Sequence, residues 1–209
     1  MKKTIITLTS IAALAGVSSA QTITNSSLTG TATNTYNQSV PTGWSQFNGG
    51  SSDTWNSSVS VDGMSFSASS DGGSFVRSNG IAPEGLQQTV TGLTIGGIYA
   101  INFEQSLSSD SASTFNAGNT NWRVTFGGQT IDSTLMLTPN PGQNFGWQNQ
   151  SLTFTATAAT QNLQFVALNP QGSHTSTAID GISLTSVPEP SSTVLLGLGA
   201  LGLIARRKK

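Results

Sequence analysis

Few residues in this chain could carry out catalysis. The 209 residues contain no cysteine and a single histidine, His174, in a Gln-Gly-Ser-His-Thr-Ser segment that we expect to be solvated. Cysteine nucleophiles, thiolate metal sites and two-histidine zinc motifs are therefore excluded. The sequence also has no Gly-x-Ser-x-Gly elbow and no phosphate-binding loop. It thus predicts a protein that is not an enzyme and that needs no catalytic cofactor.

Carboxylates are the one class of reactive side chain in good supply. Between residues 21 and 187, eight carboxylates stand against two arginines, which gives this segment a formal charge of −6. The carboxylates are Asp53, Asp62, Asp71, Glu84, Glu104, Asp110, Asp132 and Asp180. An acidic segment repels phosphate backbones, so nucleic acid is excluded as a partner. Two carboxylates facing each other across a cleft would suit a secreted glycoside hydrolase, and that alternative stays open.

Three aromatic residues, Trp44, Phe47 and Trp55, lie in a stretch rich in glycine, serine and asparagine. Flat aromatic rings stack on pyranose rings, and nearby amide or carboxylate side chains supply the polar contacts of a sugar site. These residues are therefore the candidate binding site for an extracellular polysaccharide. The alternative is that Trp44 is a core residue on an early strand, because large aromatic side chains are mostly buried. We expect Trp122 and Trp147 to be core residues.

Alternation of apolar with polar residues predicts strands that bury one face. Tyr99, Ile101 and Phe103 show this period of two. It recurs at residues 59–61, 64–66, 86–90, 122–126, 152–156, 163–167 and 182–184. Glycine pairs fall between several segments, and no window between the two ends shows the apolar stripe of a helix. We predict about eight or nine antiparallel strands in a single all-β domain, a β-sandwich of jelly-roll type, with loops at residues 105–121 and 169–177.

The N-terminus has the plan of a secretory signal peptide. Lys2 and Lys3 precede an apolar stretch over residues 5–17, which is followed by Ser18-Ser19-Ala20. A cationic start, a short apolar helix and small residues at the cleavage position are what signal peptidase requires. We therefore predict cleavage between Ala20 and Gln21.

The C-terminus also has the features of a membrane-targeting segment. Val187-Pro188-Glu189-Pro190 precedes an apolar run over residues 194–205 and a basic end at residues 206–209. As a helix the run would cover about 18 Å at roughly 1.5 Å per residue, against about 30 Å of hydrocarbon. Such a segment suits a temporary stop in a membrane better than a permanent span. The basic end would stay cytoplasmic and leave the middle segment outside.

The order of a Pro-Glu-Pro element, a short glycine-spaced apolar helix and a basic end resembles a PEP-CTERM sorting tail of Gram-negative bacteria. The resemblance covers roughly residues 187–209. It implies that an exosortase in the inner membrane recognises Val187, Pro188, Glu189 and Pro190 and removes the tail. The protein would then pass through the inner membrane transiently and reach the cell surface or the extracellular matrix.

Residues 86–99 together with Phe103, and residues 178–184 much later, resemble carbohydrate-binding modules with a galactose-binding-like jelly roll. The resemblance implies that Asp180 occupies a position where such modules often place a calcium ligand. The usual acidic residue near the start of the module is absent here, because the chain reads Asn25-Ser26-Ser27-Leu28. A structural calcium ion at Asp180 and an ordinary turn aspartate are therefore both open.

These observations divide the chain into a signal peptide (1–20), a β-sandwich domain (21–186) and a sorting tail (187–209). We predict an exported, non-enzymatic protein of the cell surface or extracellular matrix, which contacts glycans or has a structural role. A secreted glycoside hydrolase is one alternative. A self-assembling surface-layer subunit, joined through an exposed sheet edge, is the other.

Overall fold

The computed structural model describes residues 21–33, 39–48, 52–78, 84–110, 120–137, 142–168 and 175–188. Within these residues the chain forms strands and turns and no helix. The strands are β1 (Ser45–Phe47), β2 (Ser52–Asn56), β3 (Ser60–Val61), β4 (Met64–Ser65), β5 (Ser74–Ser78), β6 (Gly85–Thr91), β7 (Ile98–Ser109), β8 (Asn121–Phe126), β9 (Gln129–Asp132), β10 (Asn144–Thr155), β11 (Thr160–Leu168) and β12 (Thr175–Ser186).

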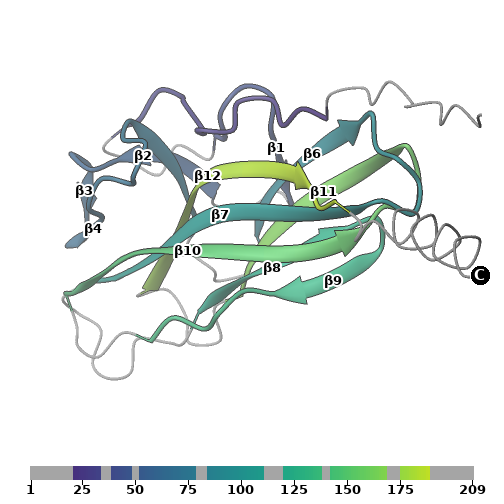
Figure 1. Cartoon of the computed structure of the whole chain (residues 1–209). Coiled ribbons are helices and arrows are strands. Elements are labelled where there is room, and N and C mark those ends of the chain that lie inside the picture. Colours follow the sequence, from purple (N-terminus) through teal and green to yellow (C-terminus); the bar gives the residue numbers. More distant parts are fainter. Residues whose placement is uncertain are drawn as a thin grey trace, which may run out of the picture.

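Two five-stranded antiparallel sheets pack face to face (Figure 1). Sheet A has the strand order β1-β6-β11-β8-β9, and sheet B has the order β10-β7-β12-β5-β2. The predicted antiparallel β-sandwich is therefore confirmed. The predicted signal helix and C-terminal membrane helix lie outside the described residues. In the described part of the chain, no helix has the length and apolar character that crossing a membrane requires.

The core lies between the two sheets and follows from the alternation in the sequence. Ile101 and Phe103 of β7 point inward, where Phe103 meets Phe165 of β11 edge to face at a centroid distance of 5.3 Å. Trp122 is fully buried in the same core. Inward residues alternate with outward ones because successive side chains of a strand point to opposite faces. The outward residues of sheet B therefore form a separate surface.

Both expected loops are partly strand. The first five residues of the predicted loop at 105–121 continue β7 to Ser109, and β12 begins at Thr175, inside the second predicted loop. Serines and glutamine break the apolar pattern there, yet β7 is hydrogen-bonded to β10 on one side and to β12 on the other. Two flanking strands satisfy the backbone whatever the side chains are, so tertiary pairing overrides the weak local signal.

A flap, defined as residues 57–73, covers part of the outer face of sheet B. It contains the small hairpin of β3 and β4 and contributes Met64 and Phe66 to a second apolar cluster. The sheet contributes Trp55 of β2 and Phe75 of β5 to that cluster. The ring of Phe66 lies edge to face on Phe75 at a centroid distance of 5.4 Å. Sheet B is thus buried on its whole inner face and on one part of its outer face.

Candidate functional site

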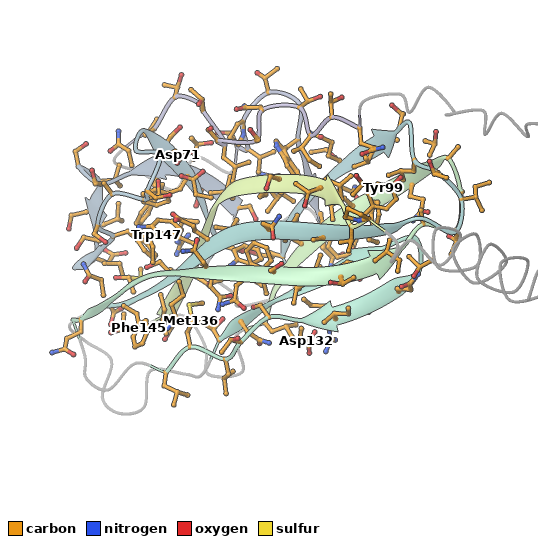
Figure 2. All side chains as sticks on the ribbon, viewed as in Figure 1. Asp71, Tyr99, Asp132, Met136, Phe145 and Trp147 are labelled. Carbon is orange, nitrogen blue, oxygen red and sulfur yellow. The ribbon has the colours of Figure 1, made fainter. Side chains whose placement is uncertain are left out.

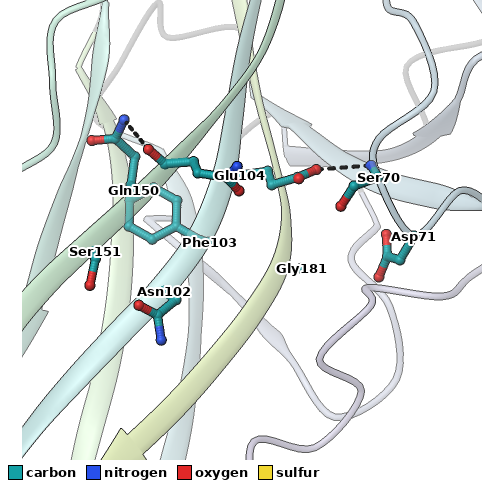
Figure 3. A pocket seen from close by; sticks show the side chains of 9 residues that line it. Ser70, Asp71, Asn102, Phe103, Glu104, Gln150, Ser151 and Gly181 are labelled. Carbon is teal, nitrogen blue, oxygen red and sulfur yellow. Dashed lines mark hydrogen bonds between the residues drawn. The ribbon is translucent and has the colours of Figure 1, made fainter. Parts of the chain in front are cut away.

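A pocket of about 360 Å³ opens on the outer face of sheet B, beside the flap (Figure 3). The residues that line it are Ser70, Asp71, Asn102, Phe103, Glu104, Asn149, Gln150, Ser151 and Gly181. The register places Asn102 opposite Ser151 and Glu104 opposite Asn149, so β7 and β10 present polar side chains side by side. The backbone N–H of Ser70 donates to Oε2 of Glu104 at 3.0 Å and joins the flap to the floor of the pocket.

Asp180 lies beneath this pocket, opposite Glu104 in the pairing of β12 with β7. It is completely buried, and its Oδ1 atom accepts no regular hydrogen bond. The hydroxyl oxygen of Ser69 lies 2.5 Å from Oδ2 of Asp180 and 3.2 Å from Oδ1 of Asp71. A serine hydroxyl has one hydrogen, so it can donate to only one of the two carboxyl groups.

This environment shifts the pKa of Asp180 strongly. Burial raises the pKa of Asp180 from 3.8 to about 8, and nearby Asp71 adds to the rise. The hydrogen bond from Ser69 and the nearby backbone N–H of Gly181 oppose it. The Ser69 hydroxyl lies between the two carboxyl groups and so links Asp180 to Asp71 at the rim of the pocket.

A β-bulge at Gly181 makes this placement of Asp180 compatible with the core. The pairing of β12 with β7 shifts between Asp180 and Ser183. The extra residue lets Asp180 face outward while Ile182, two positions later, is fully buried in the core between the sheets. Gly181 has a φ of 60°, in the left-handed region that favours glycine.

The pocket carries negative charge without a basic residue in its lining. Asp71 and Glu104 both line it. In the described part of the chain, both arginines take part in ion pairs: Arg77 with Asp53 at 3.0 Å, and Arg123 with Asp132 at 2.7 Å. The lining offers carboxylates, amides and hydroxyls, which are the groups that bind the hydroxyls of a sugar.

The aromatic residues predicted to bind glycan do not form this site. Trp44 is 8% exposed, and its indole N–H donates to the carbonyl of Asn25 at 3.1 Å. Trp55 is completely buried in the second cluster. Neither ring has a free face on which a pyranose could stack; the core alternative holds for Trp44, and Trp55 is buried as well. Phe47 is half-buried on β1, in the other sheet.

Asp180 is not a turn aspartate, because it lies within the twelve-residue strand β12. Ca²⁺ takes six to eight oxygen ligands. In the residues that the structure describes, no three His, Cys, Asp or Glu side chains are grouped so as to hold a metal ion. Calcium at Asp180 stays a prediction, and a Tm that rises on adding calcium would support it.

The residues of the predicted processing sites fall at the edges of the described region. Gln21 and Val187 are described, and Pro188 is the last described residue of the sorting motif. Ala20, Glu189 and Pro190 lie outside the described residues. Val187 is 38% exposed.

The sequence does not single out several of the pocket residues. Asn102, Asn149 and Ser151 stand on the polar phase of strands, where a solvated surface is the usual interpretation. Ser70 and Asp71 belong to a segment that the glycines at positions 72 and 73 mark only as a turn. Glu104 is the one pocket residue that the sequence points to, because this carboxylate lies on the strand with the clearest apolar alternation.

The fold and this pocket define a jelly-roll β-sandwich with a polar pocket on the outer face of one sheet. The PEP-CTERM protein-sorting motif matches residues 186–209, which begin at the last residue of β12. The chain therefore carries a PEP-CTERM sorting tail. The motif supports an exported, surface-directed protein and implies processing by exosortase, a membrane protease.

Solved structures share the fold. The Stig cyclase Fisc from Fischerella sp. TAU, in complex with (3Z)-3-(1-methyl-2-pyrrolidinylidene)-3H-indole, has a TM-score of 0.54 at 15% identity, over 81% of this chain and 98% of the cyclase. A second cyclase from Fischerella sp. TAU has a TM-score of 0.51 at 14% identity, over 72% of this chain and 88% of its own. At such identities the similarity shows the fold alone.

Binding modules also appear among the structural neighbours. The CBM22-1 xylan-binding domain from Paenibacillus barcinonensis has a TM-score of 0.43 at 12% identity, over 71% of this chain and 88% of its own. No curated protein sequence matches this chain.

Proposed function

We propose that the protein is a non-enzymatic glycan-binding protein of the bacterial surface or extracellular matrix. The sorting motif supports its delivery. The observation that carries the binding function is the pocket of about 360 Å³, whose lining of amides, carboxylates and hydroxyls comes mostly from neighbouring strands. Small-molecule sites of this size place a few polar groups on a rigid scaffold to fix the orientation of the ligand.

The charge of the pocket defines the class of glycan. Asp71 and Glu104 face a ligand with no basic residue in the lining to balance them. A uronic acid or a sulfated sugar would bring like charge into the pocket, which costs binding energy. Neutral hexoses and sugars with a free amino group are therefore the ligands that we propose.

Glycan binding is tested with immobilised neutral, amino and acidic polysaccharides and the full-length protein. We expect retention on neutral or amino polysaccharides, and Asn102→Ala, which removes an amide from the pocket, should weaken it at least tenfold. The matched control is Asn162→Ala. Asn162 is exposed on sheet A, away from the pocket, and its side-chain amide donates to Gln87. Equal retention of both variants would favour a structural role for the body.

Glycoside hydrolysis is a second candidate, and one observation favours it. Asp71 and Glu104, from segments far apart in the sequence, line the same pocket, as the paired carboxylates of a glycosidase do. Asp180 cannot serve as the acid, because it is completely buried. Release of reducing ends that stops in both Asp71→Asn and Glu104→Gln would establish this function. Binding without release would support the non-enzymatic proposal.

A further inference from the structure

The chain enters and leaves the β-sandwich at the same end. The side-chain amide of Gln21 donates to the carbonyl of Gly92 at 3.4 Å. The backbone N–H of Val187 donates to the carbonyl of Ile98 at 2.8 Å. Both described ends accordingly lie on one side of the sandwich in Figure 1. The signal sequence and the sorting tail therefore attach to one end, which we name the tail-exit end.

Three turns complete the tail-exit end: residues 92–97, 127–128 and 156–159. They are joined by hydrogen bonds, from the N–H of Gly96 to the carbonyl of Ala156 at 2.8 Å, and from the Thr157 hydroxyl to the carbonyl of Gly127 at 3.3 Å. These hydrogen bonds join the turns into one continuous surface, to which both sheets contribute.

This surface carries no charged side chain. Residues 85–98, 124–131 and 150–165 contain no Asp, Glu, Lys or Arg. Glu104 stands six residues along β7 from Ile98, which corresponds to about 20 Å at roughly 3.4 Å per residue. Asp132, four residues from Gly128 on β9, is about 14 Å away on the same rise and is paired with Arg123. Both distances exceed the Debye length of about 8 Å at physiological salt. The acidity of the body therefore does not reach the tail-exit end.

Apolar side chains are exposed at the same place. Ile95, in the turn between β6 and β7, is 68% exposed, and Val187 is 38% exposed. The other large apolar side chains exposed in the described part, Leu135 and Leu137, flank Met136. Met136 pairs with Thr120 just before β8 begins, at the opposite end of that strand from the turn at 127–128. In Figure 2, Asp71 and Trp147 lie on the left of the sandwich, far from Tyr99, which lies on the right near the tail-exit end.

A sorting tail inserted in the membrane, as the sequence predicts, would keep this end close to a bilayer. Five residues separate Pro188 from Val194, where the apolar run begins. Fully extended, the six steps from Pro188 to Val194 reach at most about 22 Å. We propose that the tail-exit end is a membrane-docking surface, which rests on the lipid headgroups while the tail is in the bilayer, with Ile95 at the point of contact. An uncharged surface with an exposed aliphatic side chain is chemically suited to that interface.

The absence of cysteine gives a direct test. The full-length protein is reconstituted in vesicles of phosphatidylethanolamine and phosphatidylglycerol, with an environment-sensitive fluorophore on a single cysteine introduced as Ile95→Cys. Thr94→Cys is a second probe that keeps Ile95. Leu135→Cys is the matched control, because it labels an aliphatic position 49% exposed away from this end. Quenchers attached to lipid headgroups report contact, and circular dichroism checks that each labelled protein is folded.

We expect several-fold stronger quenching at positions 94 and 95 than at position 135. Equal quenching at the three positions would overturn the proposal. A parallel set of vesicles contains the processing protease. If the probes at 94 and 95 were shielded only in those vesicles, the surface would bind a protein rather than lipid, and the proposal would also fail.

Discussion

The two faces of sheet B are built on different principles. Its inner face packs against sheet A through apolar side chains such as Ile101, Phe103 and Ile179. Its outer face, under the flap, buries Asp53, Arg77 and Asp180 as well as aromatic rings. Apolar groups of similar size would often stabilise a buried site equally well or better, so a buried ion pair is weak evidence for stability. The outer face is better understood as a scaffold that positions the flap and the pocket.

The largest expected effect comes from the buried ion pair of the outer face. The Arg77 guanidinium bonds to Asp53 and to the Ser176 hydroxyl, and it lies 5.1 Å from the centre of a Trp55 ring. Arg77→Ala would leave the Asp53 carboxylate buried without its ion-pair partner. We expect the free energy of unfolding to fall by about 3–5 kcal/mol. Urea denaturation measures this loss. A loss smaller than that of Arg123→Ala, which breaks an exposed ion pair, would contradict the scaffold interpretation.

The pH dependence of stability separates Asp180 from an ordinary surface carboxylate. Because its folded pKa of about 8 exceeds the usual 3.8, the folded state holds the proton more tightly. Its contribution is fully present below pH 3.8 and is lost as the pH rises towards about 8, with a slope of at most about 1.4 kcal/mol per pH unit. Asp180→Asn, whose amide can donate to Ser69, should flatten the curve in that window. Thermal melts from pH 4 to pH 9 measure the change.

Asp132→Asn is the control for that experiment, because its effect has the opposite sign. The hydrogen bond from Arg123 lowers the pKa of Asp132 below its usual value. Its contribution is therefore present above pH 3.8 and is lost only in more acidic medium, so Asp132→Asn should leave the slope between pH 4 and pH 9 unchanged. A curve for Asp180→Asn that kept the slope of the natural protein would show that Asp180 is ionised in the fold.

The β-bulge provides a smaller test on the same strand. Gly181→Ala places a side chain at a φ of 60°, where nothing lies within 4 Å of the added carbon, so the cost is backbone strain alone. We expect a loss of about 1–2 kcal/mol in the free energy of unfolding. Gly146→Ala is the matched control, since the added carbon there also meets nothing within 4 Å and φ is not positive. Equal losses would remove the argument for strain at the bulge.

The smallest effect belongs to sheet A. Arg123 and Asp132 form a two-bonded pair between neighbouring strands, with side chains 47% and 40% exposed. Arg123→Ala should cost no more than about 1 kcal/mol, because water screens an exposed pair. The loss in Arg123→Ala is measured by the same urea denaturation as the loss in Arg77→Ala, so the exposed and buried pairs can be compared directly. A cost as large as that of Arg77→Ala would mean that burial does not distinguish the two pairs.

Much of the architecture could be predicted from sequence. Tyr99, Ile101 and Phe103 alternate cleanly because one face of β7 is buried, and that alternation indicated antiparallel strands. The short strands β1, β2, β5 and β9 lie outside the predicted segments. β5 is buried on both faces, so its residues Phe75, Val76 and Arg77 do not alternate.

The candidate site was less predictable. A sugar site was expected on Trp44 and Trp55 because composition alone cannot tell a stacked ring from a core ring. The pocket instead joins Asp71, Glu104 and Gly181, which are brought together by strand register and by a bulge. Register depends on pairing partners distant in the chain, and the local sequence does not contain that information.

The position of the tail on β12 has a mechanical consequence. A body held by its C-terminal segment while a bound partner pulls away would transmit the force into β12. That strand is hydrogen-bonded to β7 along most of its length and to β5 on its other side. A pull along the strand axis loads these bonds together in shear rather than opening them one after another. The attachment point thus suits a protein that must stay folded under tension.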